Sequence, residues 1–183
     1  MKEIKKYAEQ VAAKVKNDLF DYNKIKQNIY IRLYGKDVDI EFPMEFPHTT
    51  VSDLIAVCYV DLSNTETDDS MTTNVSKTML KAWGVSFETV LKDAQENMLK
   101  EFDYHSMFDI MQEMMDDMLS AGMTTMDEFA EMRYNPMRVL TKKDKLYGAG
   151  MLAVPEVLEK VFGSKRMLIL PSSVHEGATR FAA

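Results

Sequence analysis

The spacing of apolar residues changes from helical to alternating within the first third of the chain. From Ile4 to Leu19 the apolar residues recur at helical spacing with charged residues between them, which predicts an amphipathic helix. Ile29, Ile31 and Leu33 then alternate with more polar neighbours, the period of a half-buried strand. We expect this strand to end at Gly35.

The next apolar run is continuous rather than alternating. Residues 54–60 are mostly β-branched, aromatic or small apolar residues, which favours a buried strand over a helix. Residues 61–70 are polar and acidic, and the threonine-rich stretch after them predicts a second, more exposed strand. Together the two strands are expected to form a hairpin with a long loop.

The middle third of the chain carries the signals of helix starts. Ser86 can cap a helix that runs to about Lys100, and its inner face would contain Phe87, Val90, Leu91, Ala94 and Met98. Ser106 with Asp109 resembles a capping box, and so does Thr125 with Glu128. We therefore predict a helical middle third.

The last third alternates again between strand and helix patterns. Residues 137–141, 148–154 and 167–170 predict strands, and a helix should start at Pro155 and end at Gly163. The order of strand, short helix and strand suggests a right-handed βαβ crossover. We expect one domain over residues 1–183, an α/β or α+β fold whose mixed sheet uses segments near residues 29, 55, 72, 139, 151 and 168, with helices packed on it.

Charge and cysteine content exclude several classes of partner. The formal net charge is -7, and the lysine cluster of Lys142, Lys143 and Lys145 is short and turn-like, so we expect no binding to nucleic acid. Cys58 is the one cysteine and lies in an apolar run, which fits a buried thiol in a reducing cytoplasm. No stretch has the length of a membrane span or a secretory apolar region, so we expect no membrane association.

The chain is rich in methionine, with 16 residues, and several of these share one helix face. Core packing is the simplest interpretation of that stripe. A binding groove for a protein partner and a cuprous site are the alternatives, because thioethers are flexible and soft. A copper site would need cysteine or histidine neighbours that the spacing does not supply. The candidate partner-binding residues are Met107, Met111, Met114, Met115 and Met118.

A second candidate site follows the last predicted strand. Ser172, Ser173, His175 and Glu176 are of the nucleophile, base and orienting types. Neighbours in an extended segment point to opposite sides, and neither a nucleophile elbow nor a His-Glu-x-x-His zinc motif is present. In the structural interpretation Pro171 closes the strand, the two serines bond free backbone groups at the turn, and His175 bonds a neighbouring loop or carboxylate. The alternative is a ligand-contact or catalytic role.

Other polar motifs are weaker. His48 and Asp53 could form an acid/base set but no signal fixes their geometry, and His105 is most simply a surface histidine near a helix cap. Gly148 and Gly150 form only a Gly-x-Gly without the third glycine of a dinucleotide fingerprint. We therefore expect no metal and no cofactor.

Several strings of the sequence together resemble a known family. They are Leu80 to Val85, Val139 to Thr141, Leu146 to Ala149, Pro155 to Glu159 and Leu170 to Glu176. They are similar to an uncharacterised family, a domain of unknown function, found mainly in anaerobic Gram-positive bacteria such as Lachnospiraceae. Relatives follow the last string with an apolar strand, whereas residues 177–183 are mixed, so we expect a weak final strand. The resemblance implies no substrate, cofactor or catalytic residue.

Two functional hypotheses remain. The first is a non-enzymatic interaction or regulatory module that uses the methionines of the helical middle, and it rests on the lack of a complete catalytic motif. The second is a small hydrolase or transferase that uses His175 with Ser172 or Ser173 and a carboxylate. The second hypothesis requires a pocket around that segment.

Overall fold

The computed structural model describes residues 19–35, 45–63, 71–122, 125, 127, 130, 137–144, 146–163, 167–171 and 177–181. The helix expected over residues 4–19 and the capping pair of Thr125 with Glu128 lie outside these ranges wholly or in part. The contacts divide the chain into two compact units, Met1–Lys100 and Glu101–Ala183, which are described separately. A single domain therefore stays a prediction. The mixed α/β fold class is confirmed, since each unit combines an antiparallel sheet with helices.

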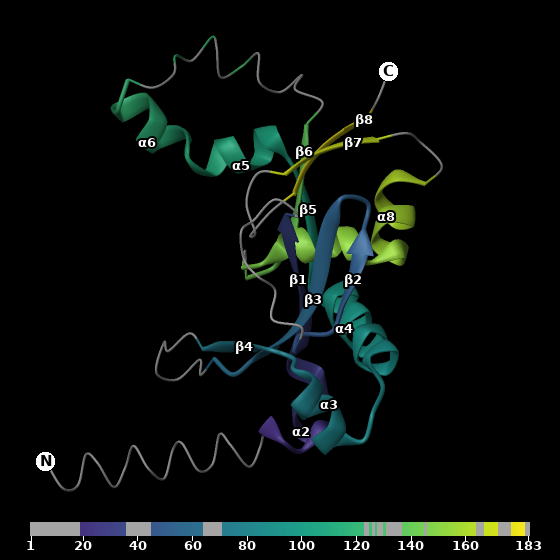
Figure 1. Cartoon of the computed structure of the whole chain (residues 1–183). Coiled ribbons are helices and arrows are strands. Elements are labelled where there is room, and N and C mark those ends of the chain that lie inside the picture. The colour runs from purple at the N-terminus through teal and green to yellow at the C-terminus, as the bar shows by residue number, and fades with distance from the viewer. Residues whose placement is uncertain are drawn as a thin grey trace, which may run out of the picture. The chain divides into compact units, whose positions relative to one another are not determined.

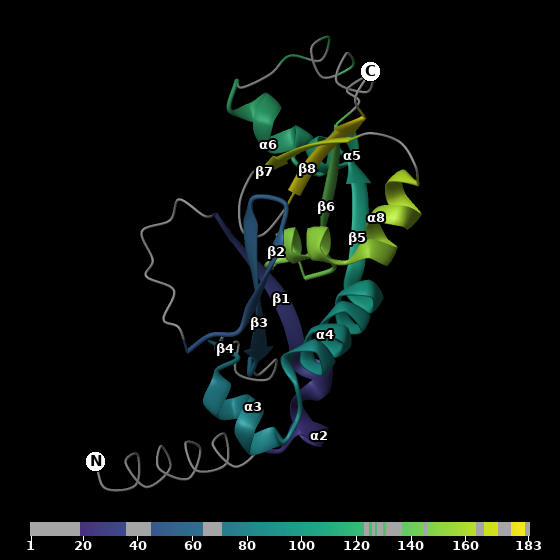
Figure 2. The same ribbon diagram turned by 45° about the vertical axis from the view of Figure 1, so that its right-hand side comes forward.

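The first unit is built on an antiparallel sheet in which β3 is central (Figures 1 and 2). One edge of β3 (Leu54–Asp61) pairs with β1 (Ile29–Gly35), with Ile31 opposite Cys58. Its other edge pairs with β2 (His48–Val51) and then with β4 (Thr72–Asn74). The strands predicted near residues 29, 55 and 72 are confirmed, and so is the hairpin with a long loop.

Strand β2 is not among the elements predicted from the sequence. Thr49, Thr50 and Val51 are the β-branched residues of this strand, and Ser52 and Asp53 form the two-residue turn that joins it to β3. Ser52 has a φ of 56°, as the first position of such tight hairpins requires. Asp53 is therefore a turn residue, at the opposite end of β2 from His48.

One face of this sheet forms the core of the first unit. Ile29, Ile31 and Leu33 of β1 are buried, as the alternation predicts, and Ala56, Cys58 and Val60 share their face of the sheet. The long helix α4 (Phe87–Glu101) contributes Val90, Ala94 and Met98. The hydroxyl of Ser86 accepts a hydrogen bond from the backbone of Thr89 at 3.3 Å, which confirms the predicted helix start.

A buried amide joins α4 to the start of the sheet. Asn97 lies on the inner face of α4, 7% exposed, and its Nδ2 donates to the carbonyl oxygens of Lys26 at 2.7 Å and Ile29 at 3.0 Å. Those carbonyls belong to η1 (Lys26–Asn28) and to the first residue of β1. Because buried carbonyls need a donor, Asn97 fixes where the helix meets the strand.

Two short helices close one end of this sheet (Figures 1 and 2). They are α2 (Tyr22–Ile25), capped by Asp21, and α3 (Lys77–Trp83), capped by Ser76. The rings of Tyr22 and Trp83 lie 5.4 Å apart, and the Tyr22 hydroxyl donates to Asp93 of α4 at 2.6 Å. Burial and the Asp93 carboxylate both raise the pKa of Tyr22 above its ordinary value.

The second unit contains its own antiparallel sheet, in the order β5-β6-β8-β7. Its strands are β5 (Phe102–Ser106), β6 (Arg138–Lys142), β7 (Met167–Pro171) and β8 (Gly177–Phe181). The segments proposed for one sheet therefore belong to two sheets. The last segment was expected to be a weak strand, but β8 pairs with β6 on one side and with β7 on the other.

The segment between β6 and β7 differs from the prediction. The strand expected over residues 148–154 is wrong, because Gly148–Ala153 form a 3-10 helix, η2, whose residues are all buried. Its glycines and alanines are not the β-branched or aromatic residues that favour strands. The segment is apolar because it is buried, not because it is a strand. It leads directly into α8 (Pro155–Phe162), which starts at Pro155 and is followed by Gly163, as predicted.

The predicted βαβ crossover differs in the strand that leads into its helix. No strand directly precedes α8, because η2 occupies that place. The connection through η2 and α8 instead joins β6 to β7, and both of these strands are antiparallel to β8, which lies between them. β6 and β7 therefore run in the same direction without being neighbours.

Replacing Asn97 by Leu tests the buried amide. The variant Asn97→Leu keeps the branched shape of the side chain but leaves two carbonyls without their donor, so we expect a loss of about 2 kcal/mol in the free energy of unfolding. Urea denaturation monitored by circular dichroism measures this loss. Glu96→Ala, an exposed position on the same helix, should change the free energy by less than about 0.5 kcal/mol. Equal effects of the two substitutions would contradict the assigned role.

Candidate functional site

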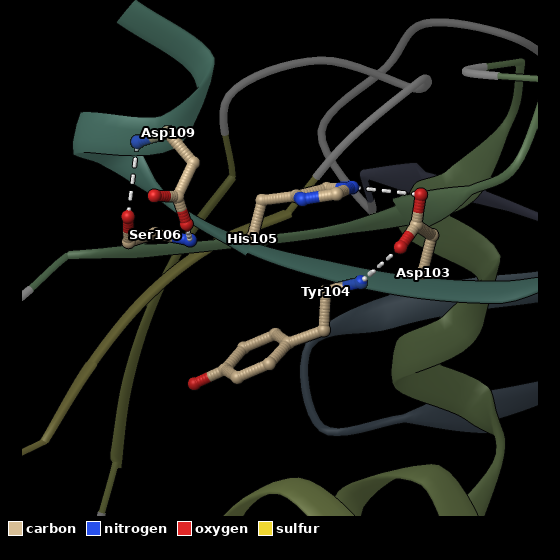
Figure 3. A network of polar contacts seen from close by, with 5 residues as sticks. All are labelled: Asp103, Tyr104, His105, Ser106 and Asp109. Atoms are coloured by element: carbon tan, nitrogen blue, oxygen red, sulfur yellow. Dashed lines mark hydrogen bonds and ion pairs between the residues drawn. The ribbon is translucent and has the colours of Figure 1, made fainter. Parts of the chain in front are cut away.

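The most polar cluster that the structure describes in the second unit lies on β5 and at the start of the helix that follows it (Figure 3). Successive residues of the strand point to opposite sides, so Asp103 and His105 share one side and Tyr104 and Ser106 the other. The strand pairs with β6, where Arg138 is opposite Ser106. This arrangement brings charged side chains together from β5, β6 and the following helix.

Asp103 and His105 form a direct pair on their side of the strand. His105 Nε2 lies 2.7 Å from Asp103 Oδ2, and the side chains are 37% and 35% exposed. The other carboxylate oxygen of Asp103 accepts a hydrogen bond from the Tyr104 backbone at 2.9 Å, so the carboxylate is held at both oxygens. Because the pair is partly exposed, its contribution to stability is at most about 1 kcal/mol.

The start of α5 (Met107–Glu113) is fixed by a reciprocal capping box. Ser106 Oγ accepts from the Asp109 backbone at 3.0 Å, and Asp109 Oδ2 accepts from the Ser106 backbone at 3.1 Å. Hydrogen bonds from Ser106 lower the pKa of Asp109, with smaller contributions from the charges of His105 and Arg138. The capping box predicted from the sequence is therefore confirmed.

The opposite side of β5 packs against α8. The rings of Tyr104 and Phe162 meet edge to face at 6.2 Å, and Lys160 Nζ lies 5.0 Å from the centre of the Phe102 ring. Burial raises the pKa of Tyr104, and Arg138 opposes that shift. These contacts hold the strand that positions the polar cluster and the first turn of α5.

Methionine side chains follow this cluster along the chain. We define the methionine surface as Met107, Met111, Met114 and Met115, the described side chains of the predicted stripe. Met114 is 54% exposed and the other three are half-buried, so the structure does not place them in the core. The side chain of Met118 lies outside the description.

The helix that carries these methionines is interrupted at Met114. α5 ends at Glu113 and α6 (Met115–Ser120) begins two residues later, with Met114 as the C-cap of α5. The Met114 backbone donates to the carbonyl of Met111 at 3.1 Å, a tighter turn than an α-helix makes. Met107 and Met111, four residues apart, share a face of α5, and Met114 lies at the break that precedes α6.

The sequence around the methionine surface carries charges of one sign. Between Ser106 and Met132 there is no lysine or arginine. The acidic residues in this stretch are Asp109, Glu113, Asp116, Asp117, Asp127, Glu128 and Glu131. The exposed thioether of Met114 thus lies in a strongly acidic segment of the sequence, which favours cationic ligands near it.

The sequence profile of a family of unknown function, DUF5688, matches residues 1–177. The chain belongs to the DUF5688 family. The match spans both compact units, and its description names no substrate or cofactor. Comparison of this DUF5688 chain with curated proteins gave no match, and neither did comparison with solved structures.

Two further findings concern ligands and membranes. Within the described ranges of this DUF5688 chain, no three histidine, cysteine, aspartate or glutamate side chains gather closely enough to hold a metal ion. None of the helices in the same ranges combines the length and the apolar character needed to cross a bilayer.

Four of the sequence-predicted site residues of the DUF5688 chain lie outside the described ranges. They are Ser172, Ser173, His175 and Glu176. The residues that flank them, Pro171 and Gly177, are register partners at the paired ends of β7 and β8. The hypothesis about their chemistry therefore remains a prediction.

The weaker motifs occupy structural positions. His48 is exposed on β2, and its Nδ1 lies 3.1 Å from the Phe46 carbonyl oxygen. Lys142 is 2% exposed and its Nζ lies 2.9 Å from Asp144, so this member of the lysine cluster points inward. Sequence reasoning missed the pairing of Asp103 with His105, which a strand assignment for residues 102–106 would have indicated through their spacing of two.

Removing the cap hydroxyl tests how α5 begins. We expect Ser106→Ala to reduce the free energy of unfolding by about 1 kcal/mol, because the first turn loses its side-chain acceptor. Ser106→Thr retains a hydroxyl and should recover most of that loss. Thermal or urea unfolding of the three proteins measures the difference, and equal stability of Ser106→Ala and the wild type would contradict the role of the cap.

The pKa of Asp109 provides a second test of the capping box at the start of α5. Its pKa is lower when folded than when unfolded, so the stabilisation is present above the unfolded value and is lost as the pH falls through the folded one. Carboxyl-carbon NMR should give a midpoint below the ordinary 3.8 in the wild type and a higher midpoint in Ser106→Ala. A wild-type midpoint at or above 3.8 would overturn the assignment.

Proposed function

We propose that this DUF5688 protein is a non-enzymatic interaction module that binds a basic, amphipathic segment of a partner protein on the methionine surface. The observation that carries the proposal is the exposure of Met114, at 54%, in a stretch of the chain that also holds the three half-buried methionines Met107, Met111 and Met115. Burying apolar area that water now contacts favours association. Methionine side chains also adapt to partners of different shape, because they are unbranched and flexible.

Charge complementarity supports a basic partner. The seven acidic residues between Ser106 and Met132 have no basic residue among them in sequence. A segment that carries lysines or arginines beside its apolar residues would bury the apolar side against the thioethers and place its cations near the carboxylates. An acidic segment of equal apolarity would be repelled, which gives the surface selectivity.

The polar cluster on β5 supports the proposal by fixing one end of this surface. The capping box holds the first turn of α5, and β5 is held in the sheet by its pairing with β6. Met107 and Met111 therefore lie on a part of α5 that is already ordered, so binding a partner costs less conformational entropy there.

No observation favours the hydrolase or transferase alternative. It depends on His175 with Ser172 or Ser173, which lie outside the described residues, and the family match names no activity. For the setting we propose a bacterial cytoplasm, supported by the lack of a second cysteine that could pair with Cys58.

Binding of synthetic helical peptides tests the proposal. A fluorescent peptide of about five helical turns, with leucines on one face and lysines on the other, should bind the full chain by fluorescence anisotropy. The same peptide with glutamate in place of lysine should bind far more weakly. We expect Met114→Gln to weaken binding about fivefold, since covering the exposed half of a methionine is worth about 1 kcal/mol.

The chain offers a matched control. Met71, before β4 in the first unit, is 44% exposed, and Met71→Gln makes the same chemical change away from the methionine surface. It should leave peptide affinity unchanged, and neither variant should alter the melting temperature appreciably. Equal binding of the two peptides, or equal loss in the two variants, would overturn the proposed function.

A further inference from the structure

The methionines of this chain differ widely in their access to solvent. Met79, Met98 and Met151 are buried in the two cores, whereas Met114 and Met71 are the exposed ones among the described residues. Met107, Met111 and Met115 lie between these extremes. Access to the thioether sulfur decides how fast a methionine is oxidised, so the methionine surface should react before the core does.

The one thiol does not compete for an oxidant. Cys58 is fully buried on β3, and burial raises its pKa to about 12. Only the thiolate reacts readily with peroxides, and at neutral pH this thiol is protonated and inaccessible. The exposed sulfur chemistry of the described chain is therefore that of thioethers.

We propose that the methionine surface is a reversible oxidation site for hydrogen peroxide, and that its oxidation switches off the binding of the basic partner. The inference rests on the proposed function for what is switched, and on the graded exposure of the thioethers for where the chemistry occurs. It adds a modification site to the surface formed by Met107, Met111, Met114 and Met115.

The reaction balances with peroxide as the only co-reactant. A lone pair of the thioether sulfur attacks one peroxide oxygen, the O–O bond breaks and an S–O bond forms. The sulfur is oxidised by two electrons to the sulfoxide, and the second peroxide oxygen leaves as water after a proton shift. Hydrogen peroxide is neutral, so the negative charges carried by this stretch of the sequence do not repel it.

The product has the opposite character from the thioether. A sulfoxide is polar and accepts hydrogen bonds, so covering it with an apolar partner removes it from water without compensation. If several of Met107, Met111, Met114 and Met115 are oxidised, the cost of removing each sulfoxide from water adds to that of the others. The acidic charges remain, so oxidation should remove the apolar part of the recognition and leave a weaker electrostatic attraction.

Residue mapping tests the site by itself. The full chain is treated with graded amounts of hydrogen peroxide, and peptide mass spectrometry follows each methionine. We expect Met114 and Met71 to be oxidised first, then the half-buried members of the surface, and Met98 and Met151 last. Oxidation of Met98 or Met151 as early as Met114 would overturn the inference, whatever the protein binds.

Peptide binding tests the switch. Oxidation to the point at which Met98 is still intact should weaken binding of the basic peptide about tenfold, and treatment with methionine sulfoxide reductases A and B should restore it. Unchanged affinity after oxidation of Met114 would overturn the inference and leave the proposed function standing. Absence of peptide binding by the reduced protein would instead overturn both.

Substitution by leucine distinguishes the effect of the oxidisable sulfur from the effect of the apolar side-chain shape. A variant with leucine at Met107, Met111, Met114 and Met115 keeps an apolar surface of similar volume, and we expect it to bind the peptide and to resist peroxide. Met71→Leu should stay as sensitive as the wild type. If the fourfold variant does not fold, Met114→Leu alone should lose less affinity on oxidation than the wild type does. Full sensitivity in either surface variant would overturn the inference.

Discussion

The second unit depends on the junction at Ser106, where strand β5 ends and helix α5 starts without a loop. The capping box makes this possible, because Ser106 and Asp109 satisfy each other's backbone N–H groups at a point where neither strand nor helix pairing can do so. The residue before it, His105, is tied to Asp103 in the strand, and the residue after it is the first methionine of the surface. One turn of backbone therefore joins the polar cluster and the apolar surface.

The first unit depends on a comparable polar contact within an apolar core. Hydrophobic burial alone would let α4 slide or rotate on the sheet, since Val90, Ala94 and Met98 make non-directional contacts. The two hydrogen bonds of Asn97 are directional and reach carbonyls at the start of β1. They select one position of the helix along the strand, which is a matter of specificity more than of added stability.

The sequence predicted elements well wherever one physical signal governed them. Alternation at Ile29, Ile31 and Leu33, the cap at Ser86 and the Pro155 to Gly163 asymmetry all act locally, and the structure confirms them. The prediction failed where tertiary burial overrode local pattern. η2 is apolar because β6 and α8 cover it, and β5 is a strand because β6 offers it a partner. The spacing of the methionine stripe predicts core packing, but the structure leaves Met114 54% exposed and Met107, Met111 and Met115 half-buried.

The proposed function requires a surface that binds its partner without also binding other copies of the chain. Exposed leucines of the same number would invite contact between copies of the chain, because identical apolar patches are complementary to each other. The acidic residues of the same segment oppose that contact, since two copies would bring like charges together. With a basic partner the electrostatic interaction is attractive instead of repulsive. The same acidic charges therefore oppose self-association and favour a cationic segment. Binding to the apolar side chains therefore depends on the charge of the approaching molecule, so the same surface can have affinity for one class of partner and reject others.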